Sequence, residues 1–183
     1  MSEAIKEKEV QYIEYLKNHA INIRRAFDTY GVFIARLLYC NIGELELRIN
    51  SHDQSKYSNA EFNAYRKRFF PVNDEEALTD DSEEFKAAWE HHYLANSHHP
   101  EHYFKLGSPH EMPNIDIAEM ILDWIAMSYE FGDTAYSYYD SSSKPGILHP
   151  NTKFKVEYIL HELRYFDKDS RADKKIIIPE TLL

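Results

Sequence analysis

Cysteine and glycine are both scarce in this chain. Cys40 is the single cysteine among 183 residues, so no disulfide can form within the chain. Cys40 lies in the apolar run GVFIARLLYCNIGEL, which indicates a buried core thiol in a reducing compartment. The 5 glycines are too few for a turn-rich all-β fold and are typical of long helices.

Net positive charge and long apolar runs are also lacking. The formal net charge is −10, which argues against general nucleic-acid binding because such binding depends on Lys and Arg neutralising phosphates. A small nucleotide could still bind where a metal ion supplies positive charge locally. The longest apolar run contains Arg36 and is too short to cross a bilayer, and the charged N-terminus is unlike a signal peptide. We therefore expect a cytoplasmic protein that does not bind membranes.

Apolar residues that recur every three or four positions predict an all-α fold, a single-domain bundle of about six helices over residues 1–183. The expected helices cover residues 5–28, 32–50, 58–70, 82–96, 115–138 and 150–167. Gly31 is expected to separate the first two helices, and a capping box of Ser58 and Glu61 to start the third. We expect loops at 72–83 and 100–114, a turn at 141–146 and a short extended segment at KKIIIPETLL.

The helix expected at 115–138 is apolar nearly all round, which indicates burial. Asp116, Glu119 and Asp123 nevertheless share one stripe, since spacings of three and four place residues on one face. Buried carboxylates are unfavourable unless they are paired or bind a metal. The alternative is a stripe that faces solvent. His19 similarly borders the apolar stripe of the first helix, where a hydrogen-bonded core histidine is the simpler interpretation.

Histidines are concentrated between residues 91 and 102. The segment contains His91, His92, His98, His99 and His102. In a continuous helix, His91 and His98 would share a face, and so would His92 and His99, because each pair is seven residues apart. Neutral imidazole is a common ligand of transition metals, so this density indicates metal binding rather than a His-rich surface patch.

A His-Asp pair, His52 and Asp53, follows the second expected helix. Adjacent residues cannot share a helix face, but at a helix end both can turn toward one ion. Together with His19, the His-rich segment and Asp123, four segments offer nitrogen and oxygen ligands and no thiolate. This mixture suits Mn, Fe, Ni, Co or Zn in an open hydrolytic site rather than a closed structural zinc site.

The ordered set resembles the HD-domain superfamily of metal-dependent phosphohydrolases, which are helical bundles. The order His, His-Asp, extra His residues and then Asp is met by NHAIN, SHDQSK, HHYLANSHHPE and LDWIAMS. Lys56 and Ala126 stand at the spacings often found after the His-Asp pair and the last Asp. The resemblance covers a metal-site core of about residues 10–130, leaving the C-terminal helix and tail at 147–183 outside it. More narrowly, the motifs resemble an uncharacterised HD-like family of bacteria and phages.

The resemblance implies metal-dependent hydrolysis of a phosphate ester, such as a nucleotide or a similar small phosphomonoester or diester. One or two divalent ions would be held by His19, His52, Asp53, His92, His98, His99 and Asp123. It stays open which member of each doubled pair, His91/His92 and His98/His99, binds metal. Three residues have expected catalytic roles. Asp53 would bridge metals or position water, and Lys56 would stabilise phosphoryl charge. Glu101 would orient a histidine or accept a proton. Glu119 would hydrogen-bond the ligands without binding the metal itself. Lys144 and His149 could reach a substrate.

Two other functions stay open. One is a non-catalytic helical binding protein stabilised by its metal, because sites with many histidines also hold bundles together. The other is a di-iron oxygenase, since an open His/carboxylate site permits oxygen chemistry. The aromatic-rich helices would suit a homodimer.

Overall fold

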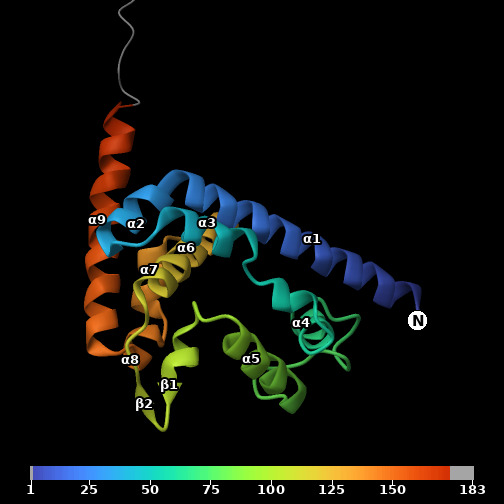
Figure 1. Ribbon diagram of the computed structural model, residues 1–183. Helices are drawn as coiled ribbons and strands as arrows, with labels where there is room; N and C mark the ends of the chain where they lie inside the picture. Colours follow the sequence, from blue (N-terminus) through green and yellow to red (C-terminus); the bar gives the residue numbers. More distant parts are fainter. Residues whose placement is uncertain (1, 174–183) are drawn as a thin grey trace, which may run out of the picture.

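In this computed structural model, the described residues are 2–173, and they form an all-α fold (Figure 1). Within that range the only strands are β1 (Phe104–Lys105) and β2 (Ser108–Pro109), a short antiparallel hairpin. The predicted fold class is confirmed. None of the helices in residues 2–173 combines the length and apolar character needed to cross a membrane.

Gly31 does not separate the first two helices, contrary to the sequence prediction. α1 (Glu3–Ala26) continues through a π-helical turn (Phe27–Gly31) directly into α2 (Val32–Leu38). A Cβ atom at Gly31 would lie 2.6 Å from Cδ2 of the Phe27 ring, so the glycine serves close packing inside a helix rather than a turn.

The second expected helix is instead divided at Tyr39. That residue has a left-handed backbone with a φ of 55°, and α3 (Ile42–Asn50) then begins with the Asn41 side chain accepting a hydrogen bond from Glu44 N. Cys40 lies at this break and is half-buried rather than fully buried.

The capping box predicted at Ser58 and Glu61 does not form. α4 (Phe62–Phe69) follows a 3-10 turn (Gln54–Tyr57), and the Ser58 hydroxyl is buried without a partner among the described residues. The Glu61 carboxylate is fully buried and points to α5 (Glu83–Ala95), where it contacts two histidines. A long-range contact has therefore displaced the local cap.

The C-terminal half begins with α6 (Asn114–Phe131). The predicted helix 115–138 is two helices, because Gly132 ends α6 with a φ of 75° and Thr134 caps α7 (Ala135–Ser141). The predicted turn at 141–146 overlaps a short helix, α8 (Lys144–Ile147), and α9 (Pro150–Asp173) follows. A 3-10 turn (Pro100–Tyr103) and the hairpin occupy the predicted loop at 100–114. The extended segment expected at KKIIIPETLL lies outside the described residues.

Two hydrophobic clusters position the polar site. The larger cluster surrounds α6 with residues of α1, α2, α3 and α9, and the smaller cluster joins α1 to α4 and α5. In Figure 1, α4 and α5 lie beneath the N-terminal half of α1. On α1, Leu16 belongs to the smaller cluster and Ile23 to the larger, so His19 lies where the two meet.

The Arg66–Glu76 ion pair gives the first testable prediction. Arg66 is buried and donates from both Nη atoms to Glu76, which also accepts from Val72 N, so the pair ties the 72–83 segment to α4. We expect Glu76→Gln to lower the free energy of unfolding by about 2 kcal/mol at pH 7, because the guanidinium is left without its charge partner.

The pH dependence of this loss follows from the pKa of Glu76. The hydrogen bond with Arg66 lowers that pKa to about 2 in the folded chain, below its ordinary value of 4.5. The stabilisation is therefore complete above pH 4.5 and is lost as the pH falls toward 2. Urea unfolding at several pH values measures it. Glu75→Gln, an exposed neighbour, is the control, and an equal loss in both variants would contradict the assignment.

Candidate metal centre

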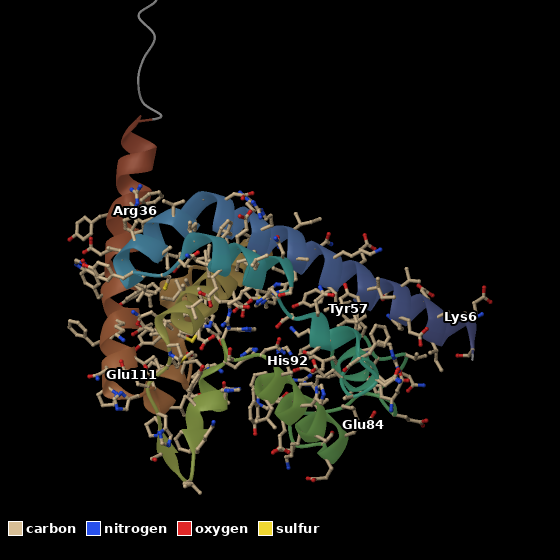
Figure 2. All side chains as sticks on the ribbon, in the orientation of Figure 1. Lys6, Arg36, Tyr57, Glu84, His92 and Glu111 are labelled. Atoms are coloured by element: carbon tan, nitrogen blue, oxygen red, sulfur yellow. The ribbon has the colours of Figure 1, made fainter. Side chains whose placement is uncertain are left out.

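Separate parts of the fold bring histidine and aspartate side chains to one buried place. The residues are His19 on α1, His52 and Asp53 in the turn after α3, His92 on α5, His98 and His99 beyond the end of α5, and Asp123 on α6. Figure 2 labels His92, which lies on the side of α5 that faces the rest of the bundle and is 1% exposed. Every residue predicted as a metal ligand is in this group.

The turn after α3 sets the direction of the His-Asp pair. α3 ends at Asn50, and Asp53 has a left-handed backbone with φ 56° and ψ 19°. Such a backbone is uncommon outside glycine, and strain of this kind is frequent at functional sites. The turn allows His52 and Asp53 to face the same interior space, with His52 Nε2 3.7 Å from Asp53 Oδ2.

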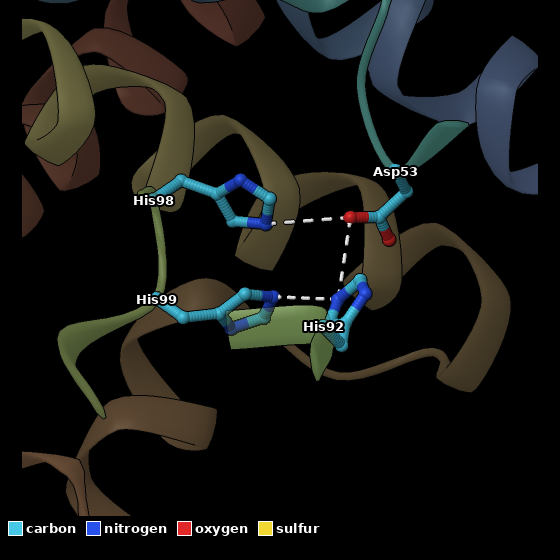
Figure 3. Close-up of side chains that lie close together, drawn as sticks. All are labelled: Asp53, His92, His98 and His99. Atoms are coloured by element: carbon cyan, nitrogen blue, oxygen red, sulfur yellow. Dashed lines mark hydrogen bonds and ion pairs between the residues drawn. The ribbon is translucent and has the colours of Figure 1, made fainter. Parts of the chain in front are cut away.

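The first ligand group gathers around one oxygen of Asp53 (Figure 3). Asp53 Oδ1 lies 3.4 Å from His92 Nε2 and 3.5 Å from His98 Nε2. His99 Nε2 is 2.9 Å from His92 Nε2. α5 ends at Ala95, so His98 and His99 reach this place from a separate segment and do not share a helix face with His91 and His92.

The second ligand group gathers around the other oxygen. Asp53 Oδ2 lies 3.9 Å from His19 Nε2 and 3.7 Å from His52 Nε2. Asp123 Oδ1 lies 3.2 Å from His19 Nε2 and 3.5 Å from His52 Nε2. Within each group, the candidate ligand atoms of His19, His52 and Asp123, or of Asp53 and its three histidines, all lie within 4.8 Å of one another.

Unpartnered polar atoms show that this place fits a cation. His19 Nε2, His52 Nε2, Asp53 Oδ1 and His98 Nε2 are all buried without a hydrogen-bond partner among the described residues. Such atoms are rare in folded proteins, because each loses its water without replacement. Buried imidazole nitrogens and carboxylate oxygens that converge on one space are what a divalent metal ion coordinates. These buried side chains are therefore placed to coordinate a metal ion.

Two carboxylates behind the histidines fix their orientation. Glu119 Oε1 lies 2.9 Å from His52 Nδ1 and 3.3 Å from His98 Nδ1, and Glu61 Oε2 lies 2.8 Å from His92 Nδ1. A carboxylate at Nδ1 holds the proton there and leaves the Nε2 lone pair for a metal. Glu119 therefore orients one histidine from each ligand group.

A further layer holds Glu119 in place. Arg48 Nε donates to Glu119 Oε2 over 2.6 Å, and another nitrogen of the same guanidinium contacts Asp116. Asp116 also accepts from Ser97 Oγ at 2.7 Å and from the Tyr103 hydroxyl. The facing atoms of Glu119, His52 and His98 also lie within 4.8 Å of one another, but the positive charge that Arg48 supplies to Glu119 favours a hydrogen-bonding role for this carboxylate.

Negative charge dominates the electrostatics of the centre. Burial lowers the pKa of His52, but the negative charges of Asp53 and Asp123 and the hydrogen bond with Glu119 raise it to about 10. Burial raises the pKa of Asp53, yet His52 and Lys56 hold it well below its ordinary value. Burial lowers the pKa of His99 well below its ordinary value, so this ring is neutral. Carboxylates that hold a proton on His52 would equally favour a bound cation.

A cavity of about 300 Å³ opens onto these ligands. Its polar wall includes Lys56, whose Nζ lies 2.6 Å from Asp53 Oδ2, and Lys144 on α8. Its apolar wall is formed by Tyr65, Phe69, Trp89, Met120, Trp124, Met127 and Tyr138. The cavity is thus large enough for a small organic molecule and places two ammonium groups beside it.

Other predicted site residues lie as follows. Glu101 contacts Lys144 Nζ at 2.5 Å and is not among the residues that line the cavity, so its catalytic role stays a prediction. Lys144 does line the cavity, whereas His149 does not. His91 faces Glu61, with a side chain that is 46% exposed, and lies outside both ligand groups. The stripe of Asp116 and Glu119 is buried rather than solvent-facing.

Sequence reasoning did not find Glu61, Arg48 and Tyr65. Glu61 resembled a helix cap, and Arg48 lies at the end of an expected helix like any surface arginine. The signal that could have found Arg48 is the buried carboxylate stripe itself, since such a stripe requires a cation nearby.

A family model covers most of the chain. Residues 8–162 match a family of unknown function, DUF5662. The chain belongs to this family. No curated protein and no solved structure gives a match to the chain. The function of this family is unknown, so the geometry of the centre is the basis for a functional proposal.

Glu119 gives the prediction for this centre. We expect Glu119→Gln to weaken metal binding by about 10- to 100-fold, because the variant loses the charge that holds His52 and His98 in position. A competition titration with a chromophoric chelator measures the affinity. Glu130→Gln, an exposed position on the same helix, is the control. Equal affinity of Glu119→Gln and wild type would contradict the role.

Proposed function

We propose that this protein is a metal-dependent phosphohydrolase that cleaves a phosphate ester, most simply a nucleotide or a similar small phosphomonoester or diester. The observation that carries the proposal is the position of Asp53. Each of its carboxylate oxygens faces a different group of ligand atoms. A carboxylate shared in this way is typical of two-metal sites that act on phosphates.

The proposed cofactor is a pair of divalent ions of Mn, Fe, Ni, Co or Zn. The residues that would hold them are those of the two groups, with Asp53 common to both. The chemistry supplied by divalent ions in such a site is a water molecule of lowered pKa and neutralisation of phosphoryl charge. Local positive charge of this kind lets a chain with a net charge of −10 bind an anionic substrate.

The chain's own residues would perform the remaining tasks. Lys56 is a half-buried ammonium, with a side chain that is 16% exposed. Burial lowers its pKa, but the charge of Asp53 raises it further, so Lys56 stays charged and can hold a phosphoryl oxygen. The aromatic wall of the cavity offers flat surfaces to an organic group such as a nucleobase. The ordered motifs that resemble the HD-domain superfamily support the same chemistry.

Metal stoichiometry tests whether Asp53 serves both groups. We expect about two ions per chain in the wild type, about one in His19→Ala and in His92→Ala, and none in Asp53→Ala. Elemental mass spectrometry of each purified variant measures the ratio. His161→Ala, an exposed histidine, is the control. A wild type with one ion, or with none after dialysis against these metals, would contradict the two-ion centre.

Phosphate release tests the reaction. We expect the metal-replete protein to release phosphate from at least one compound in a screen of nucleotides and small phosphate esters. Lys56→Met should lower kcat by about 10²–10³-fold because a donor to the phosphoryl group is lost, whereas Lys86→Met, on the surface, should not.

The same samples discriminate the alternatives. Protein that contains metal, cleaves no ester and unfolds on chelation would favour a metal-stabilised binding protein. Two irons with a visible absorption band would favour the oxygenase.

A further inference from the structure

Two tyrosines in the small cluster have buried hydroxyl groups without a partner. Tyr12 is 1% exposed and Tyr65 is 5% exposed, and neither hydroxyl has a hydrogen-bond partner among the described residues. A buried hydroxyl normally finds such a partner, so an unsatisfied one requires an explanation. Burial alone does not distinguish the two hydroxyl groups, so their surroundings decide which of them could contact a ligand.

The two tyrosines differ in their position relative to the metal-facing cavity. Tyr65 lines the cavity together with Asp53, Lys56 and His92, whereas Tyr12 is not among the lining residues. Tyr12 instead packs against the rings of Tyr15, Phe62 and Phe70.

The Tyr65 ring neighbours both the proposed phosphoryl-binding cation and a metal-ligand histidine. Lys56 Nζ is 5.6 Å from the centroid of its ring, and the His92 ring is 5.6 Å away on centroids. The position on α4 is fixed by further edge contact with Phe85. A phenol held here can donate one hydrogen bond without adding charge to a centre that already contains Lys56.

We propose that the Tyr65 hydroxyl donates a hydrogen bond to an oxygen of the phosphoryl group bound in the cavity. This role rests on the proposed phosphohydrolase function. It gives a partner to the unpartnered hydroxyl of a residue that lines the cavity, and it adds a neutral donor to the charge of Lys56. A donor aimed at a phosphoryl oxygen strengthens as charge develops there during transfer.

The test compares Tyr65→Phe with the matched variant Tyr12→Phe. Each substitution removes one buried, unpartnered hydroxyl and leaves the ring. Inorganic phosphate is titrated by calorimetry into wild type and both variants, each reconstituted with Mn²⁺ and checked for equal metal content. We expect Tyr65→Phe to weaken phosphate binding by about 10- to 100-fold, the range for losing one hydrogen bond to a charged group, while Tyr12→Phe matches wild type.

Melting temperature separates a ligand contact from a structural role. Because the Tyr65 hydroxyl has no protein partner, the metal-free Tyr65→Phe protein should melt at or above the wild-type temperature. Three results would overturn the role of Tyr65 alone. They are an unchanged phosphate affinity in Tyr65→Phe, an equal loss of phosphate affinity in Tyr12→Phe, and a loss of phosphate affinity in Tyr65→Phe that accompanies reduced metal content. Metal-replete wild type that binds no phosphate and cleaves no ester would overturn the proposed function and this role together.

Discussion

The burial of the Asp53 carboxylate is the constraint on which the rest of the centre depends. A charge removed from water is strongly unfavourable unless other charges and hydrogen bonds replace the lost hydration. Here the replacement comes from Lys56 on one oxygen and from histidines around both. The left-handed backbone of Asp53 adds to the cost. Both penalties fall on one residue, so its role is something other than stability. The nitrogen atoms around Asp53 indicate a place in a metal site.

α6 shows how a buried helix can carry charge in layers. Asp123 lies among the ligands, Glu119 lies one turn away behind two histidines, and Asp116 holds the arginine that neutralises Glu119. The same helix supplies many of the fully buried apolar residues of the larger cluster. Rigid packing on the other faces of α6 therefore fixes the stripe, which matters because misplaced ligands lose affinity steeply.

Local pattern was enough for some features and not for others. The spacing of apolar residues predicted the helical fold, and the ordered His and Asp residues predicted which side chains would meet. Helix boundaries failed where packing decides them: Gly31 lies inside a helix against Phe27, and Tyr39 rather than a glycine breaks one. Glu61 satisfied a local capping pattern, yet its carboxylate is used 31 residues away at His92. A periodic pattern does not show contacts between residues so far apart in the sequence. The residues that hydrogen-bond the ligands, such as Glu61, could therefore not be predicted even where the ligands themselves were.

The centre also joins the two hydrophobic clusters. His19 and Asp123 come from the helices of the larger cluster, whereas His92 and the Glu61 that orients it belong to the α4–α5 part of the smaller cluster. α1 is the apolar link between the clusters, through Leu16 on one side of His19 and Ile23 on the other. Ligands from both sides would make a bound ion a second link, so the position of α4 and α5, and with it the cavity wall at Lys56 and Tyr65, would depend on metal occupancy. Because residues of both ligand groups also line the cavity, the shape of the cavity would change with the occupancy of the metal site.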